Sequence, residues 1–102
     1  MNNGLKQRDI ETINNIFKKH KEIKTVYLFG SRATGNYKTG SDIDFAIMNK
    51  VDNEIIYKLL DDFEESSLPY FVDVINYHLI ENEYLKNNID KYGILFYSAE
   101  IK

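Results

Sequence analysis

Apolar and polar positions alternate along this chain with two different periods. Apolar residues between 10 and 17 recur three and four positions apart with polar residues between them, and this spacing is typical of an amphipathic helix. Similar spacing appears twice more. Three helices are therefore expected: residues 7–20, a stripe from Ile55 to Phe63 that a cap at Asp52 or Asn53 begins, and residues 81–89.

Short runs rich in β-branched and aromatic residues predict strands between these helices. The expected strands are residues 25–29, 42–48, 70–76 and 94–97. In the first, apolar residues occupy both parities, which indicates burial on both faces. In the second, the apolar odd-numbered residues point one way, whereas Asp42 and Asp44 point the other.

A short helix over 31–34 and a polar loop over 35–41, bounded by glycines, complete the pattern. Helices and strands then alternate along the whole chain. This order predicts the α/β class: a small mixed sheet of about four strands flanked by helices. With 102 residues, the chain is expected to form a single domain, 1–102.

Composition narrows the function classes. The net charge is −3, which argues against direct nucleic-acid binding, because such proteins normally carry a basic excess. There is no cysteine, so disulfides and thiolate metal sites are excluded and a cytoplasmic location is expected. No signal peptide or membrane span is expected. His20 and His78 lack metal-ligand spacing and are expected at the surface.

Three carboxylates stand on strands whose other residues are mostly apolar: Asp42, Asp44 and Asp73. Residues two apart on a strand share a face, so Asp42 and Asp44 can chelate together, and Asp73 can join them if its strand pairs beside theirs. Carboxylates cannot hold phosphates, but they can hold Mg²⁺ ions that do. The alternative is that Asp42 and Asp44 are ordinary polar residues on the exposed face of a strand.

Ten residues separate Gly30-Ser31, which can donate hydrogen bonds to a phosphate, from Asp42. Gly30 lets the backbone approach an anion closely, and Ser31 offers its hydroxyl and amide at the start of a short helix. Arg32 can add a cationic contact to phosphate. Arg32 can equally pair with a nearby carboxylate, and the sequence leaves both interpretations open.

The stretches LFGSRATGNYKTGSDIDFAI and FVDVI together resemble the nucleotidyltransferase superfamily related to DNA polymerase beta, in particular its minimal nucleotidyltransferases. The resemblance implies a polymerase beta-like core, ATP as donor, Mg²⁺ as cofactor with two ions, and transfer of AMP with release of pyrophosphate. It assigns Gly30 and Ser31 to the phosphates and Asp42 and Asp44 to the metals. It makes Asp73 the third ligand, which also helps to activate the acceptor hydroxyl.

Minimal members of this superfamily typically act as antitoxins, so the resemblance also implies a partner. That partner is a HEPN toxin, modified on a tyrosine hydroxyl, and a homo- or hetero-oligomer is possible. A chain this short is expected to leave no residues for a second, acceptor-binding domain, which favours a protein acceptor on an open surface. Two alternatives remain: a binding module that neutralises the toxin by contact alone, and a nucleotidyltransferase acting on a small molecule such as an antibiotic.

Overall fold

The computed structural model describes residues 3–99 and contains four α-helices, four strands and one 3-10 helix in that range. In chain order the elements are α1 (Gln7–Lys18), β1 (Thr25–Phe29), α2 (Ser31–Thr34), β2 (Ile43–Ile47), α3 (Asn53–Glu65), β3 (Val72–Asn76), the 3-10 helix η1 (Tyr77–Leu79), α4 (Glu83–Tyr92) and β4 (Ile94–Ser98). Helices and strands alternate as the hydrophobic pattern predicts.

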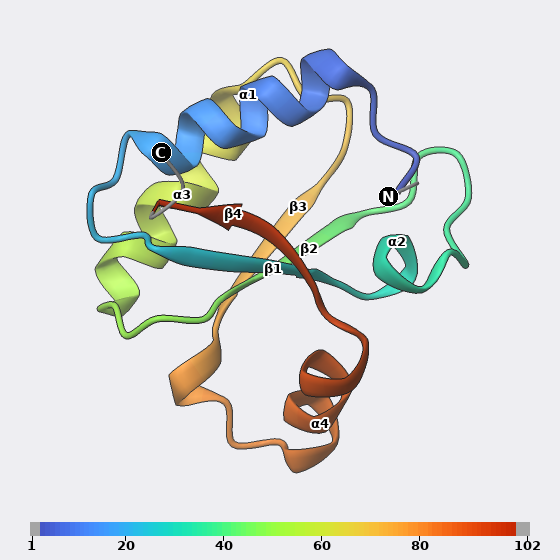
Figure 1. Ribbon diagram of the computed structural model, residues 1–102. Helices are drawn as coiled ribbons and strands as arrows, with labels where there is room; N and C mark the ends of the chain where they lie inside the picture. Colours follow the sequence, from blue (N-terminus) through green and yellow to red (C-terminus); the bar gives the residue numbers. More distant parts are fainter. Residues whose placement is uncertain (1–2, 100–102) are drawn as a thin grey trace.

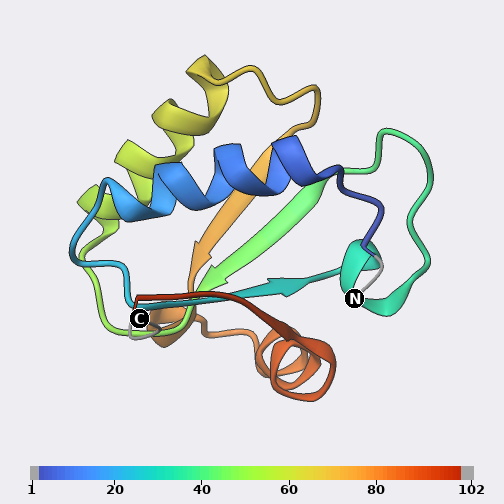
Figure 2. The same ribbon diagram turned by 45° about the horizontal axis from the view of Figure 1, so that its top comes forward.

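The four strands form one mixed sheet in the order β3-β2-β1-β4. β1 runs antiparallel to both of its neighbours, whereas β2 and β3 are parallel. Helices α1 and α3 cover one face of this sheet and α4 lies on the other (Figures 1 and 2). The end of β1 therefore lies at the same end of the sheet as the starts of β2 and β3.

Each face of the sheet buries its own apolar cluster. The larger cluster lies under α1 and α3 and takes the odd-numbered residues of β2, which are fully buried, together with Val26 and Leu28 of β1. The smaller cluster lies under α4 and includes Phe29, Ala46 and Ile89. β1 is thus buried on both faces, as predicted, and the even-numbered positions of β2 face the side on which α4 lies.

Several boundaries differ from the predicted ones. α1 ends at Lys18 and α4 runs on to Tyr92. Asp42 immediately precedes β2, because the ladder with β3 begins at Ile43. Asp52 occupies the N-cap of α3, but its side chain makes no capping hydrogen bond. The helix η1, which no apolar periodicity marks, follows β3 directly.

The two histidines have different environments. His78 is exposed, as expected. The expectation for His20 is wrong: its side chain is only 14% exposed, and Nε2 lies 2.7 Å from Oδ2 of Asp62 on α3. This contact joins the end of α1 to α3.

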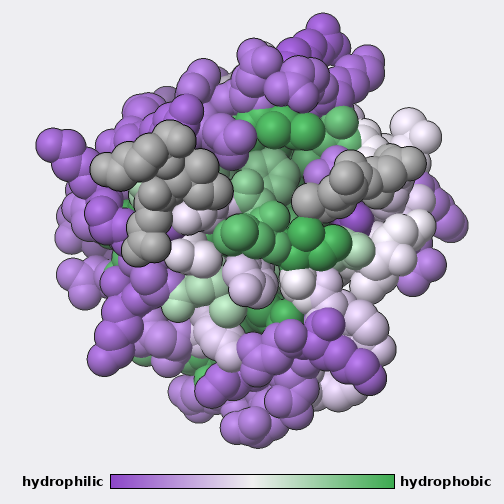
Figure 3. Space-filling model, in the orientation of Figure 1, coloured by the Kyte–Doolittle hydropathy of each residue, from purple (hydrophilic) through white to green (hydrophobic). Residues whose placement is uncertain are grey.

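Hydrophobic surface in the view of Figure 3 gathers near the middle, over β4, and hydrophilic surface surrounds it. β4 is an edge strand, and Leu95 on it is 48% exposed. Within residues 3–99, no helix combines the length and the apolar character needed to cross a bilayer.

Candidate active site

The predicted site residues meet at the end of the sheet where β1 stops and β2 and β3 start. Asp44 is the register partner of Asp73 across the parallel β2–β3 ladder and of Phe29 across the antiparallel β1–β2 ladder. The amide of Ile43 donates to the carbonyl of Phe71 over 2.9 Å, which extends this pairing back towards Asp42. Side chains of register partners point to the same face, so Asp44 and Asp73 share the face on which α4 lies.

The carboxylates of Asp73 and Asp42 lie close enough to Asp44 to repel its negative charge. Burial raises the pKa of Asp44 above its ordinary value of 3.8, and the negative charges of Asp73 and then Asp42 raise it further. Asp44 is half-buried between two exposed carboxylates, Asp42 and Asp73. A neighbouring positive charge would relieve this repulsion.

Gly30 brings the predicted phosphate-binding turn against the carboxylates. Its backbone has φ +78° and ψ −156°, and a Cβ built on it would lie 2.5 Å from Oδ2 of Asp44. No side chain fits there, and the backbone conformation is essentially restricted to glycine. Ser31, half-buried, is the first residue of α2. Gly30 and Ser31 thus adjoin Asp44, as the sequence predicts.

Arg32 is the one predicted site residue whose side chain is engaged elsewhere. It is 2% exposed. Its Nε and Nη2 donate to the carbonyl of Ser41 over 3.2 and 2.9 Å, and its Nη1 donates to the carbonyl of Asn3 over 2.9 Å. The sequence left two partners open for Arg32, a phosphate and a nearby carboxylate. The acceptors of these three bonds are instead main-chain carbonyls. The sequence could not signal them, since main-chain acceptors leave no compositional trace.

Asp42, Asp44 and Asp73 are the residues that could hold a metal ion at this end of the sheet. Among residues 3–99, no group of three or more His, Cys, Asp or Glu side chains is already gathered closely enough to enclose one. Magnesium nevertheless suits the donor set, because it takes carboxylate oxygens, usually only one or two of them, and completes its shell with water and substrate phosphates. The repulsion at Asp44 is what such a cation would offset.

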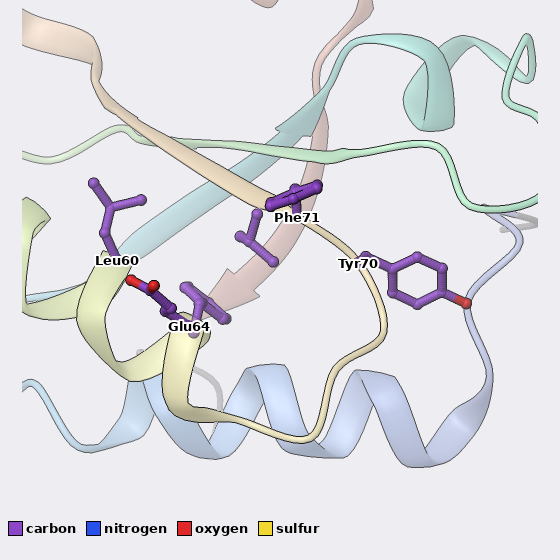
Figure 4. Close-up of a pocket in the computed structure, with 6 residues that line it drawn as sticks. Leu60, Glu64, Tyr70 and Phe71 are labelled. Carbon is purple, nitrogen blue, oxygen red and sulfur yellow. The ribbon is translucent and has the colours of Figure 1, made fainter.

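The hollow next to this site is apolar and contains none of its residues. A groove of about 270 Å³ lies between α3 and the start of β3, and is lined by Leu60, Phe63, Glu64, Tyr70, Phe71 and Val72. Figure 4 shows Leu60 and Glu64 on the α3 side, with Tyr70 reaching away from them towards the N-terminal segment. None of the three carboxylates lines this groove: Asp42 and Asp73 are exposed, and Asp44 is half-buried.

Comparison with known proteins identifies the family of this chain. A family model described as polymerase beta, nucleotidyltransferase, matches residues 11–102. The chain belongs to this nucleotidyltransferase family. Its four-stranded mixed sheet with four α-helices is the polymerase beta-like nucleotidyltransferase fold, as the sequence predicts.

Relatives within the nucleotidyltransferase family carry further information. A probable protein adenylyltransferase, MntA, of Haemophilus influenzae is 31% identical over 75 residues, which are 72% of this chain and 66% of that protein. The chain thus spans just under two thirds of this relative.

Two solved structures share the fold. A toxin–antitoxin complex with AMP-PNP gives a TM-score of 0.71 at 22% identity, covering 90% of this chain and 75% of that chain. A tri-AMPylated Shewanella oneidensis HEPN toxin in complex with its MNT antitoxin gives 0.67 at 20% identity, covering 94% and 75%.

Proposed function

We propose that this chain transfers AMP from ATP to a hydroxyl, a tyrosine hydroxyl, of a HEPN toxin and thereby acts as its antitoxin. One observation carries the proposal: the turn at Gly30 lies against Asp44, and Asp44 is paired in register with Asp73. The turn that can donate hydrogen bonds to phosphate therefore adjoins the carboxylates, as nucleotidyl transfer requires. The Haemophilus influenzae relative is a probable protein adenylyltransferase, which supports a protein as the acceptor here.

The reaction is a substitution at the α-phosphorus of ATP. The acceptor oxygen forms a bond to that phosphorus, the bond from the phosphorus to the oxygen bridging to the β-phosphate breaks, and pyrophosphate leaves. Bound Mg²⁺, in two ions on our proposal, would neutralise phosphate charge and polarise the reacting oxygens. Gly30 and Ser31 would hold phosphate oxygens, Asp42 and Asp44 would hold the metals, and Asp73 would be the third metal ligand.

Asp73 also helps to activate the acceptor hydroxyl. β3 is an edge strand and lies on the far side of β2 from β1, which ends at Gly30, so the acceptor would approach from the side opposite the phosphate turn. This order suits a roughly in-line displacement. The exposed carboxylate of Asp73 then accepts the hydroxyl proton. ATP and Mg²⁺ at such a site imply a cytoplasmic reaction.

The first prediction tests this function by label transfer. The chain is incubated with α-labelled ATP, Mg²⁺ and the partner HEPN protein, and label on the partner is measured for the wild type and for Asp42→Ala, Asp44→Ala and Asp73→Ala. Each of these three variants should lose at least about 100-fold in rate, because each removes a group that acts on the transition state. Asp61→Ala, an exposed carboxylate on α3, is the matched control and should retain transfer.

Other outcomes select the alternatives. Toxin neutralisation that persists in all three variants, without label on the toxin, would favour a binding module that acts by contact. Label on an aminoglycoside or a similar small hydroxyl compound, and none on protein, would favour a small-molecule nucleotidyltransferase. Normal transfer by Asp73→Ala would remove Asp73 from the site.

A further inference from the structure

Arg32 is a buried cation for which the proposed chemistry has no use. It is 2% exposed and follows Gly30–Ser31 directly, on a helix of only four residues. A buried guanidinium is costly unless its donors are satisfied. The hydrogen bonds and ring contacts of this side chain therefore show what it holds in place.

One partner is the loop that leads to Asp42. Two donors of the guanidinium, Nε and Nη2, converge on the carbonyl of Ser41 over 3.2 and 2.9 Å. Ser41 also closes its own loop, because its Oγ accepts from the amide of Lys38 over 2.7 Å. The next residue is Asp42. Arg32 thus fixes the main chain one residue before the first site carboxylate, relative to the turn that begins α2.

A second partner is the segment that leads to Asp73. The ring centroid of Tyr70 lies 4.7 Å from the Arg32 guanidinium carbon, within cation–π range. Tyr70 precedes Asp73 by three residues, and Figure 4 shows its ring extended away from α3 towards the N-terminal segment. The same guanidinium therefore contacts the chain ahead of both β2 and β3.

The N-terminal segment and the loop enclose the guanidinium further. The Tyr37 ring lies 5.2 Å from it, and the carbonyl of Asn3 accepts from Nη1 over 2.9 Å. A Cβ on Gly4, whose φ is +76°, would lie 2.9 Å from Nη1 and closer still to the Tyr37 ring. Three segments that are distant in sequence thus pack around one side chain.

We propose that Arg32 is the positioning residue of this active site. It sets Asp42 through Ser41, and Asp73 through Tyr70, at fixed places relative to the phosphate turn at Gly30. The inference rests on the proposed function, since it assumes that Asp42 and Asp73 act with metal and acceptor. On this proposal Arg32 acts through its bonds to main-chain carbonyls and its ring contacts, and not by contacting substrate or metal.

The second prediction compares Arg32→Lys and Arg32→Met with a matched control. Asn76→Ala is the control, because Asn76 is also buried and also donates to a main-chain carbonyl, that of Val51 over 2.8 Å, but at the opposite end of β3. Each variant is measured for its Tm, for Mn²⁺ affinity by titration of the free-ion signal in electron paramagnetic resonance, for affinity for an ATP analogue, and for the Mg²⁺ dependence of AMP transfer.

Both Arg32 variants should weaken Mn²⁺ binding and raise the half-saturating Mg²⁺ concentration by about 10- to 100-fold, as happens when a residue that orients metal ligands is lost. Lysine should not rescue, because a single ammonium cannot reproduce the forked pair of bonds to one carbonyl. Asn76→Ala should lower Tm and leave both metal measurements unchanged.

Three results would overturn the proposal. If the Arg32 variants lose Tm as Asn76→Ala does but keep normal metal affinity, Arg32 only stabilises the fold. If they lose affinity for the ATP analogue alone, Arg32 contacts phosphate. If Arg32→Lys restores metal affinity, charge alone is sufficient.

Two further features keep the test decisive. Should neither Arg32 variant fold, Tyr70→Leu replaces them, since it removes one half-buried ring contact and should still weaken Mn²⁺ binding. Wild-type protein that binds Mn²⁺ normally but labels no HEPN protein would contradict the proposed function. In that case the Mn²⁺ titrations would still decide the role of Arg32.

Discussion

Gly30 combines two constraints on a single residue, and they can be separated by mutation. Its φ of +78° with ψ of −156° strains any other residue, and a Cβ would lie 2.5 Å from Oδ2 of Asp44. Gly35, only five positions later, has φ +85° with nothing within 4 Å of its Cβ position. Both glycines thus have a positive φ, but only Gly30 also lies against a site carboxylate.

The third prediction uses this pair. Gly30→Ala should lower the free energy of unfolding by about 1–3 kcal/mol from backbone strain, and it should also abolish AMP transfer, because the new methyl group displaces the Asp44 carboxylate. Gly35→Ala should cost about 1–2 kcal/mol and leave transfer intact. Urea unfolding measures the stability and label transfer the activity. Equal activity in the two variants would mean that the Gly30–Asp44 contact is unimportant.

At the level of single residues, sequence reasoning succeeds where one local pattern decides the outcome. The alternation in β2 places Asp44 opposite the buried odd-numbered residues, as predicted. It fails for Arg32, whose acceptors lie on the main chain of Asn3 and Ser41, and for His20, whose partner Asp62 is 42 positions away. In neither case do the spacing or the types of the neighbouring residues in the sequence specify the partner.

At the level of elements, α1 and α3 are joined by a small charged cluster. Nε2 of His20 lies 2.7 Å from Oδ2 of Asp62, and Nζ of Lys19 lies 3.4 Å from its Oδ1. The hydrogen bond from His20, and then the charge of Lys19, lower the pKa of Asp62 below its ordinary value of 3.8. Because the pKa of Asp62 is lower in the folded state than in the unfolded state, its carboxylate stabilises the fold when the pH is above the unfolded-state pKa. This stabilisation is lost as the pH falls through the folded-state pKa.

The fourth prediction follows from the direction of this pKa shift. Asp62→Asn should reduce stability at pH 7 by less than about 1 kcal/mol, because the cluster is near the surface. It should also weaken the loss of stability that the wild type shows as the pH falls below about 4. Urea unfolding between pH 2 and 7 measures both effects. Asp61→Asn removes the same charge from an exposed position on α3 and should keep the acid dependence. An unchanged dependence in Asp62→Asn would show that the contact is without energetic effect.

Most of the elements themselves follow from the sequence. The predicted bounds of β1 and α2 match the structure, and all three longer helices occur where the apolar stripes place them. The 3-10 helix after β3 is missed, because a single turn is too short to show a period. The strand order β3-β2-β1-β4 is also absent from the local pattern. It depends on pairing between strands that are far apart in the sequence, such as β1 with β4.

At the level of the whole molecule, negatively charged carboxylates repel one another at the candidate site, which lies at one end of the sheet. Asp44 of β2 lies beside Gly30 and pairs in register with Asp73 of β3, and the pKa of Asp44 is raised by burial and by the charges of Asp73 and Asp42. A raised carboxyl pKa means that the folded state binds the proton more tightly than the unfolded state. The free energy of unfolding therefore falls as the pH rises from 3.8 through the pKa that Asp44 has in the folded state. This loss of stability persists at neutral pH.

The fifth prediction follows from this cost and concerns the ligand-free and liganded molecule together. Without metal at pH 7, Asp44→Asn should raise Tm by a few degrees, because it removes the unfavourable charge. In the wild type, Mg²⁺ with a non-hydrolysable ATP analogue should stabilise the fold by about 2.7 kcal/mol at a ligand concentration 100 times Kd, and EDTA should reverse the effect. The Asp44→Asn variant should gain almost nothing from the ligand. Thermal unfolding in the four combinations of variant and ligand measures both effects. Stabilisation by the analogue that persists in EDTA would mean that the nucleotide binds without the carboxylates, because a charge cluster that needs a cation cannot attract triphosphate by itself.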